Sequence, residues 1–201
     1  MSLSTFPPAS IACTSLALSR GGRTLLSGFS LKAAPGEAVV LLGPNGSGKT
    51  TLLRALAGVF APSDGEVAVE PGPEAVALLA HADGLKTAET VEDALKFWTS
   101  FAGGAAGRID QVVRDLAVAH LARRPCGTLS AGQKRRAALA RVVLSQRPIW
   151  LLDEPAAPLD TKSRQRLAAL AADHRARGGI VIAATHVDLG WEGARVLELG
   201  S

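Results

Sequence analysis

The sequence predicts an α/β fold built on a sheet of short, buried parallel strands. Three apolar runs, residues 39–42, 149–152 and 180–184, are too short for buried helices; the first stops at Gly43, and polar residues directly follow the other two. A glycine-rich loop joins the first run to a segment with helical spacing of its apolar residues. The N-terminal part predicts an antiparallel β subdomain instead, and residues 83–145 predict an inserted α-helical subdomain. We expect all 201 residues to form one domain.

The glycine-rich loop follows the first apolar run directly and precedes a helix that Gly58 ends. It matches the pattern G-x-x-x-x-G-K-[ST] in the required order of strand, loop and helix, which makes a chance glycine-rich turn a poor explanation. Such a loop holds phosphate oxygens with its backbone N–H groups, while Lys49 reaches the terminal phosphates and Thr50 holds Mg²⁺. The predicted nucleotide-binding residues are Gly43, Pro44, Asn45, Gly46, Ser47, Gly48, Lys49, Thr50 and Thr51. The chain is therefore expected to bind a nucleoside triphosphate.

The segments around this motif predict further strands. Apolar residues alternate over 11–18 and 25–31, and the turn sequence at 20–23 between them is typical of a β-hairpin. Residues 66–70 predict another strand, and the apolar run 75–80 predicts a buried one.

Residues 82–125 have mostly helical patterns. Thr90 can cap a helix that begins at Val91, which a Gly-Gly pair at 103–104 ends. A second helix is expected at about 108–122. Three aromatic residues are expected on or near the apolar face of the first helix: Phe97, Trp98 and Phe101.

Composition excludes several classes of protein. The net charge of +4 could suggest nucleic acid, but the basic residues are scattered or lie in predicted helices, and aromatic residues for base stacking make up only 4%. We therefore expect a solvated basic surface, Arg135 and its neighbours included, and no nucleic-acid partner. Cys13 and Cys126 have no metal or haem spacing and are expected to be reduced and structural. Neither a membrane-spanning run nor a secretory signal is visible, so a cytosolic position is expected.

Residues 129–133, LSAGQ, precede a helix expected at about 133–145. Ser130 can be the N-cap of this helix, a role that contributes about 1 kcal/mol. Its hydroxyl and the free N–H groups at the helix start could equally hold a second phosphate. Taken alone, the motif leaves both roles open.

Polar residues follow the other two apolar runs. Asp153 and Glu154 come directly after the run 149–152, where adjacent acids need a cation or a catalytic task. Asp153 suits a direct or indirect Mg²⁺ role, and Glu154 suits a general base acting on water. His186 follows the third run and could contact a γ-phosphate or the water, although a lone histidine is usually structural. Because ligands of open α/β sheets gather beyond the carboxyl ends of the strands, the three sets are expected to converge.

In set and order, these motifs resemble the nucleotide-binding subunits of ABC transporters over essentially the whole chain. LSAGQ is the most specific of them, since other P-loop families lack it. The resemblance implies a P-loop NTPase core of the RecA-like type that uses ATP and Mg²⁺. It also implies a head-to-tail homodimer with ATP between the P-loop of one copy and the LSAGQ segment of the other. The residues added to the nucleotide site on this basis are Ser130, Gly132, Gln133 and the D-loop residue Asp160.

The same resemblance implies a mechanism. Water attacks the γ-phosphate in line, Lys49, Mg²⁺, His186 and the partner copy's Ser130 stabilise developing charge, and Glu154 orients or deprotonates the water. Closure on ATP and opening after hydrolysis would drive separate integral membrane permease subunits.

Residues 81–87, 129–141 and 178–186 resemble more closely the ATP-binding export subunits of cytochrome c biogenesis systems, which are haem-exporter ATPases. That resemblance implies a peripheral position on the cytoplasmic face of the bacterial inner membrane. Haem as cargo rests on it alone, because the sequence contains no C-x-x-C-H motif. The alternatives are the ATPase of another small bacterial ABC exporter and a soluble ABC ATPase acting on ribosomes or DNA. A nucleotide-gated module without turnover is a third, against which Glu154 argues.

Three positions depart from the general ABC pattern. His81 stands where most ABC subunits have glutamine, so water positioning, a metal contact and coupling to the membrane subunit all remain open for it. Ala131 replaces a glycine, which indicates that this position does not need a positive φ. No aromatic residue near 20–23 can stack on adenine, and we hypothesise that Arg20 or Arg23 lies over the base instead.

Overall fold

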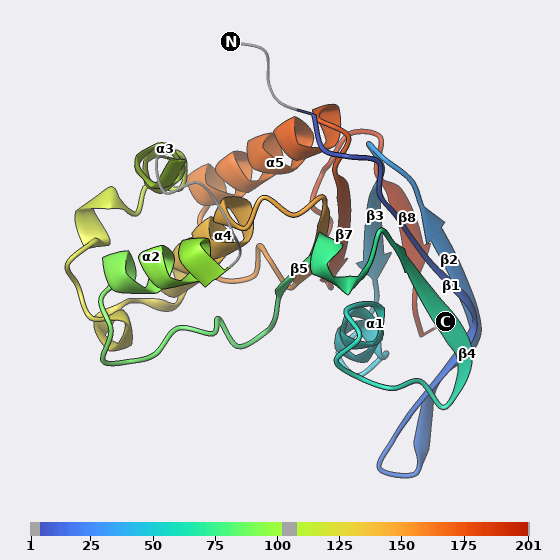
Figure 1. Cartoon of the computed structure of the whole chain (residues 1–201). Coiled ribbons are helices and arrows are strands. Elements are labelled where there is room, and N and C mark those ends of the chain that lie inside the picture. Colours follow the sequence, from blue (N-terminus) through green and yellow to red (C-terminus); the bar gives the residue numbers. More distant parts are fainter. Residues whose placement is uncertain (1–4, 102–107, 201) are drawn as a thin grey trace.

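The computed structural model describes residues 5–101 and 108–200 (Figure 1). A parallel sheet with strand order β5-β6-β7-β3-β8 forms its centre. Its strands are β3 (Ala38–Leu42), β5 (Val76–Leu79), β6 (Ile149–Asp153), β7 (Ile180–Thr185) and β8 (Arg195–Glu198). The predicted α/β fold is confirmed. Strand β8 was not predicted, because it is a four-residue edge strand whose side chains are mostly exposed and form no apolar run.

A second sheet is antiparallel, with order β2-β1-β4. It contains β1 (Ser10–Arg20), β2 (Arg23–Ala33) and β4 (Asp64–Glu70). Arg20 pairs with Arg23 across a turn in which Gly21 and Gly22 both have positive φ, so the predicted hairpin is confirmed.

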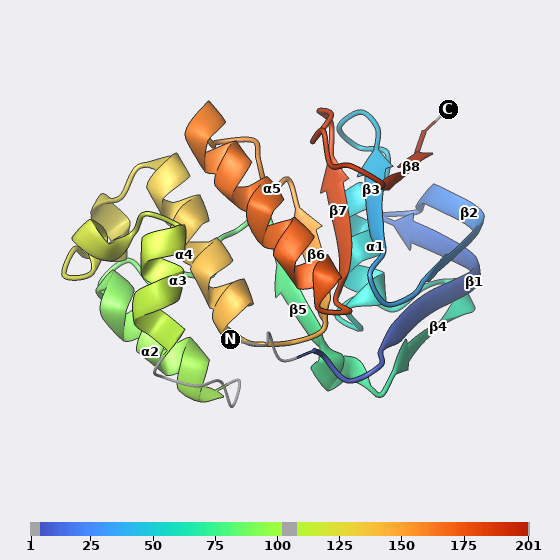
Figure 2. The ribbon, with the colours of Figure 1, turned by 90° about the horizontal axis from the view of Figure 1, so that it is seen from above.

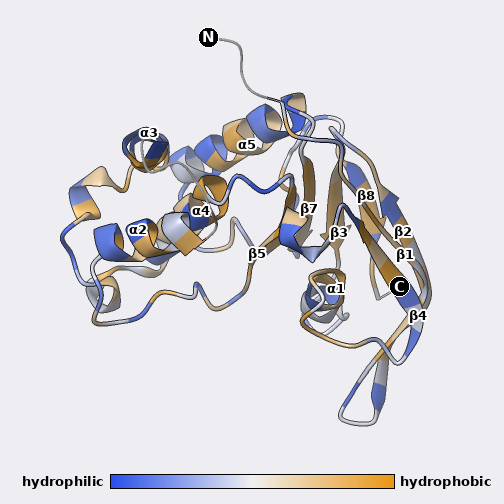
Figure 3. Ribbon diagram, viewed as in Figure 1, coloured by the Kyte–Doolittle hydropathy of each residue, from blue (hydrophilic) through white to orange (hydrophobic). Residues whose placement is uncertain are grey.

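The parallel sheet is covered on both faces (Figure 2). Helix α1 (Lys49–Leu56) lies between it and the antiparallel sheet, whereas α4 (Ala131–Leu144) and α5 (Thr161–Ala176) cover the opposite face. Alternate strand residues serve the two cores: Ile180 and Ile182 pack on the α1 side, and Val181 and Ala183 on the other. The central strands are accordingly apolar on both faces (Figure 3).

The helical subdomain contains α2 (Val91–Phe101), α3 (Ile109–Asp115) and α4. Thr90 caps α2 as predicted, since its Oγ1 accepts the Asp93 N–H at 3.2 Å. Phe97, Trp98 and Phe101 pack against one another along α2, but Phe97 and Phe101 are 53% and 69% exposed, whereas Ala94 and Leu95 of the same helix are buried. The break expected at residues 103–104 lies outside the described residues.

Helix α3 ends at Asp115, and the prediction of a helix to 122 was wrong. Ala117 takes the left-handed conformation with φ of 52°, and its N–H binds the Arg114 carbonyl at 2.9 Å. The Val118 N–H reaches back to the Val113 carbonyl at 2.8 Å, which completes a helix-terminating turn. Glycine usually signals such a turn, and alanine does not. Short 3₁₀ turns lie at Pro73–Ala75, Ala119–Leu121 and Cys126–Thr128.

Cys13 and Cys126 are buried free thiols, in accord with the prediction. Within residues 5–101 and 108–200, no helix has both the length and the apolar character needed to cross a bilayer.

Candidate active site

The phosphate loop is shaped by glycines and closed by its own lysine. A Cβ on Gly43 would lie 2.3 Å from the Leu199 carbonyl oxygen, and Gly48 has φ of 93° at the start of α1. Lys49 is the first residue of α1 and is 6% exposed. Its Nζ donates to the carbonyl oxygens of Gly43 at 2.6 Å and Pro44 at 2.8 Å, so the ammonium group is held against the loop.

Thr50 and Asp153 come together from α1 and the end of β6. The Thr50 hydroxyl lies 3.0 Å from both Asp153 carboxylate oxygens. Asp153 is 2% exposed and forms no ion pair with the described residues. A buried carboxylate beside a hydroxyl is an oxygen donor set that suits Mg²⁺, so these residues fit the predicted metal. Among the described residues, no group of three or more His, Cys, Asp or Glu side chains is arranged to hold a metal ion.

Glu154 and His186 meet beyond the ends of β6 and β7. Glu154 Oε2 lies 3.0 Å from His186 Nδ1 and accepts a hydrogen bond from Thr185 Oγ1 at 3.3 Å. The Glu154 side chain is 13% exposed, whereas that of His186 is 47% exposed. The loop, the acidic pair and the histidine therefore converge at one edge of the parallel sheet, as predicted.

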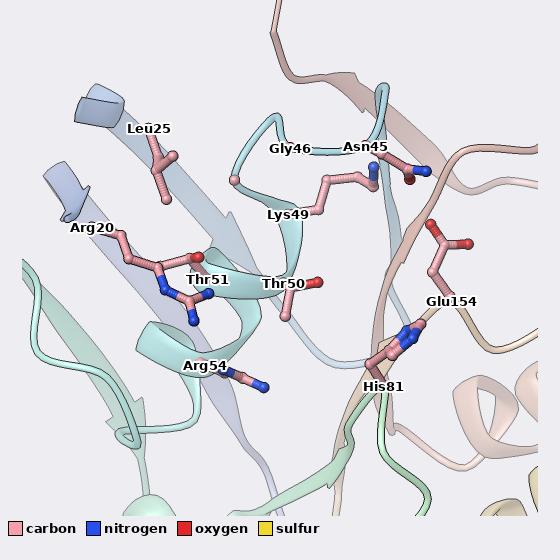
Figure 4. Close-up of a pocket in the computed structure, with 11 residues that line it drawn as sticks. Arg20, Leu25, Asn45, Gly46, Lys49, Thr50, Thr51, Arg54, His81 and Glu154 are labelled. Atoms are coloured by element: carbon pink, nitrogen blue, oxygen red, sulfur yellow. The ribbon is translucent and has the colours of Figure 1, made fainter. Parts of the chain in front are cut away.

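Of these residues, Lys49, Thr50 and Glu154 line a pocket of about 530 Å³ (Figure 4). Asp153 and His186 do not line it, but Asp153 contacts Thr50 and His186 contacts Glu154. Phosphate-loop and α1 residues form much of its wall: Asn45, Gly46, Gly48, Lys49, Thr50 and Thr51. Arg20, Leu25 and Arg54 lie on one side of it, and His81 and Glu154 lie on the opposite side. The three cations Arg20, Lys49 and Arg54 suit a polyphosphate ligand. Leu25 and Arg54 were not predicted, since only the packing of β2 and α1 brings them here.

Several predicted residues do not line this pocket. Ser47 is one, and its hydroxyl is buried without a hydrogen-bond partner among the described residues. Ser130, Gly132 and Gln133 lie at the start of α4, where the Ser130 Oγ accepts the Gln133 N–H at 3.3 Å and the Gln133 Oε1 accepts the Ser130 N–H at 3.0 Å. This capping box confirms the predicted N-cap and starts the helix at Ala131, whose φ is not positive.

Gly132 and Asp160 are neighbours through the loop before α5. A Cβ on Gly132 would lie 2.8 Å from the Pro158 carbonyl oxygen, so glycine allows this close approach. Asp160 caps α5 by accepting the Ser163 N–H at 2.7 Å, and this hydrogen bond is the main cause that lowers the pKa of its carboxyl. Neither residue lines the pocket, and their contacts with ATP stay a prediction.

Arg135 was expected on the solvated surface, and this prediction was wrong. The side chain is buried behind the carboxyl end of β6, where it donates to the carbonyl oxygens of Asp153 and Glu154. It lies on the same face of α4 as Ala138, Leu139 and Val142, all of which are buried.

Comparison with known proteins agrees with this fold. A family model described as ABC transporter matches residues 26–157. The cytochrome c biogenesis ATP-binding export protein CcmA of Maricaulis maris is 50% identical, with 96% of this chain and 94% of that protein covered. The protein of the same name from Paracoccus denitrificans is 46% identical over 94% of this chain and 89% of its own.

Solved structures have the same fold. A structure described as an ABC transporter ATP-binding protein from Pyrococcus furiosus has a TM-score of 0.83 and 25% identity, covering 94% of this chain and 97% of its own. An ATP-binding subunit of an ABC transporter reaches a TM-score of 0.85 at 20% identity. With its P-loop, its LSAGQ helix and these relatives, the chain belongs to the ABC transporter family, among the cytochrome c biogenesis ATP-binding export proteins.

Proposed function

We propose that this chain is the ATP-hydrolysing subunit of an ABC export complex that serves c-type cytochrome biogenesis, with haem as the cargo that the resemblance implies. One observation carries the ATPase assignment: Lys49, Thr50 and Glu154 line one pocket, and Thr50 contacts the Asp153 carboxylate directly. The names of the relatives, from proteins up to 50% identical, support the role in biogenesis. A peripheral position on the cytoplasmic face of the bacterial inner membrane follows from that role.

The side chains divide the chemistry among them. Lys49 and the backbone N–H groups at the start of α1 bind the β- and γ-phosphates, and Thr50 and Asp153 hold Mg²⁺. Bound Mg²⁺ neutralises charge on the phosphate oxygens. Glu154 accepts a proton from, or orients, the water that attacks the γ-phosphate. His186, whose Nδ1 lies 3.0 Å from Glu154 Oε2, uses its one ring N–H either to hold that carboxylate in place or to donate to the γ-phosphate when ATP is bound. Arg20 lies over adenine.

The active assembly is a homodimer bound to integral membrane permease subunits. Ser130, Gly132 and Gln133 are at a helix start that does not line the pocket of their own chain, which supports their use by a second copy. The hydroxyl and N–H groups of that helix start suit the γ-phosphate of the partner's ATP.

Replacing Glu154 tests the catalytic proposal. Glu154→Gln keeps the size of the side chain but removes the base, so the ATPase rate of the full chain should fall about 10²- to 10⁴-fold while ATP still binds. Glu192→Gln, an exposed glutamate outside the pocket, is the control and should hydrolyse ATP normally. Near-normal turnover by Glu154→Gln would remove Glu154 from this role.

Complementation tests the biological proposal. In a bacterium that lacks its own biogenesis ATP-binding subunit, the wild-type chain should restore haem-stained c-type cytochromes and Glu154→Gln should not. Normal ATPase activity without restored cytochromes would favour the ATPase of another small exporter.

A further inference from the structure

Arg135 is a buried cation that joins three segments of the chain. It lies on α4 and is 3% exposed. Its Nη1 donates to the Ala80 carbonyl oxygen and to Asp83 Oδ1, each at 2.8 Å. Its Nη2 donates to the carbonyl oxygen of Asp153 and to that of Glu154, the latter at 3.1 Å. One guanidinium group therefore connects α4 with the end of β6 and with the loop that contains His81.

The backbone that Arg135 holds is in a conformation that needs support. Glu154 has φ of 48°, in the left-handed region that non-glycine residues rarely occupy because it strains the backbone. Three hydrogen bonds to its backbone fix it: its N–H donates to the Ala184 carbonyl at 2.7 Å, and its carbonyl accepts from the Ala157 N–H at 3.5 Å and from Arg135 Nη2 at 3.1 Å. Because these bonds orient the peptide groups on both sides of the Glu154 Cα, they set the direction in which the carboxylate points.

The Nη1 atom of the same guanidinium holds the chain on both sides of His81. Ala80 and Asp83 bracket His81, and His81 and Glu154 lie on the same side of the pocket (Figure 4). Three of the four acceptors are backbone carbonyls, and the single carboxylate, Asp83, is 22% exposed. A planar fork with fixed N–H directions can serve two pairs of acceptors at once, which a lysine ammonium cannot do.

We propose that Arg135 is a positioning residue for ATP hydrolysis, which fixes the Glu154 carboxylate and the His81 loop relative to each other. It does not touch the pocket itself and acts through the backbone of these residues. This inference rests on the proposed function. A displacement of about 1 Å at a catalytic group can cost on the order of 10²-fold in rate, so the expected effect is on turnover and not on nucleotide binding.

The test uses the full chain with Arg135→Gln and the control Arg147→Gln. Arg147 also donates to a backbone carbonyl, that of Val76 at 2.8 Å, but at the amino end of β5, away from the pocket. Arg135→Gln should lower kcat at least about 10-fold with ATP affinity changed less than about twofold. Arg147→Gln should leave both nearly unchanged. Equal kcat values for wild type and Arg135→Gln would overturn the inference.

A double-mutant cycle separates positioning from general destabilisation. In the Glu154→Gln background the positioned base is absent, so adding Arg135→Gln should hardly change the residual single-turnover rate. Independent, multiplicative losses would overturn the inference.

If Arg135→Gln does not melt cooperatively, Arg135→Lys takes its place in the cycle, since it keeps the charge but cannot donate to both pairs of acceptors. Absence of ATPase activity in the wild-type chain would overturn the proposed function, and with it this inference; active wild type with an additive cycle would overturn this inference alone.

Discussion

Arg20 and Arg23 face each other across the β1–β2 turn, but the pocket wall contains Arg20 and not Arg23. The structure therefore favours Arg20 over Arg23 as the adenine contact, a choice that the sequence left open. A guanidinium group stacked on a base contributes roughly 0.5–2 kcal/mol through its charge and its planar face.

Arg20→Ala should therefore weaken ATP binding about 3- to 10-fold, corresponding to roughly 1 kcal/mol of lost stacking. Arg23→Ala is the matched control and should bind ATP with wild-type affinity. Equilibrium titration with a fluorescent ATP analogue on the full chain measures both. Equal affinities in wild type, Arg20→Ala and Arg23→Ala would show that neither arginine lies over adenine.

The residues that sequence reasoning found are those whose spacing is fixed by local backbone geometry. Lys49 and Thr50 must follow a glycine loop at a set distance, and Asp153 and Glu154 must follow a buried strand. Arg135 stands between Lys134 and Arg136, and charge alone does not distinguish the three. The helical spacing to Ala138, Leu139 and Val142 was the available signal, because it puts Arg135 on the buried face of α4.

Helix α5 is joined to the central sheet through a buried histidine. The His174 ring stacks on Trp150, with centroids 3.8 Å apart, and its Nε2 lies 3.0 Å from the Pro148 carbonyl oxygen. Gly179 leaves room for the ring, since a Cβ there would lie 2.2 Å from His174 Nε2. Burial lowers the pKa of His174 from 6.5 to about 4, so the folded chain keeps the ring neutral.

This packing predicts acid sensitivity. Because the pKa of His174 is lower in the folded state than in the unfolded state, the unfolded state takes up the proton first as the pH falls. The stabilisation is complete above about pH 6.5 and is lost towards pH 4, by about 2 kcal/mol between pH 7.5 and pH 5.

Urea unfolding of wild type, His174→Gln and His120→Gln at both pH values measures this effect. Between pH 7.5 and pH 5, the free energy of unfolding should fall by about 2 kcal/mol less in His174→Gln than in wild type. His120→Gln, which changes an exposed histidine, should show the same fall as wild type. The same pH dependence in wild type and His174→Gln would contradict the assignment.

Among the elements, those with a strong local pattern were predictable and those shaped by neighbours were not. The hairpin turn depends on the adjacent residues Gly21-Gly22, and the start of α4 depends on Ser130 and Gln133, so each is signalled by residues close together in the sequence. The end of α3 depends on Ala117 in a conformation that alanine rarely adopts, and β8 exists because β3 offers it an edge.

At the scale of the whole molecule, the candidate site residues form two separate groups. One group surrounds the pocket at the carboxyl ends of β3 and β6, and the other lies at the start of α4. The convergence of the phosphate loop, the acidic pair and His186 was predictable because parallel strands put their carboxyl ends at one side of the sheet. Such local patterns do not predict how two copies associate, and the proposed head-to-tail dimer rests on the family resemblance.

Mixing two inactive variants tests whether each reaction site is shared. Lys49→Ala should lose nucleotide binding, and Ser130→Arg should block the start of α4, so each alone should hydrolyse almost no ATP. A mixed dimer would contain one complete site, and an equal mixture should recover up to about a quarter of the wild-type rate if the sites act independently.

The control adds wild-type chain to a variant with both changes, Lys49→Ala and Ser130→Arg. Its mixed dimers would contain no complete site, so its rate should come from wild-type pairs alone. A mixture of the single variants that stays inactive, although light scattering shows mixed dimers, would mean that each chain completes its own site.

The capping box at the start of α4 has a consequence for which side chains position 130 can accept. One of the two lone pairs of the Ser130 oxygen accepts the Gln133 N–H, so the hydroxyl proton stays available to donate to another group. Aspartate would still cap the helix but would place a negative charge where the proposed dimer brings the partner's phosphate. Alanine could neither cap the helix nor donate a hydrogen bond to that phosphate. A small hydroxyl group can cap the helix and, in the proposed head-to-tail dimer, donate to the partner's ATP, so substitutions at this position would test folding and dimer function together.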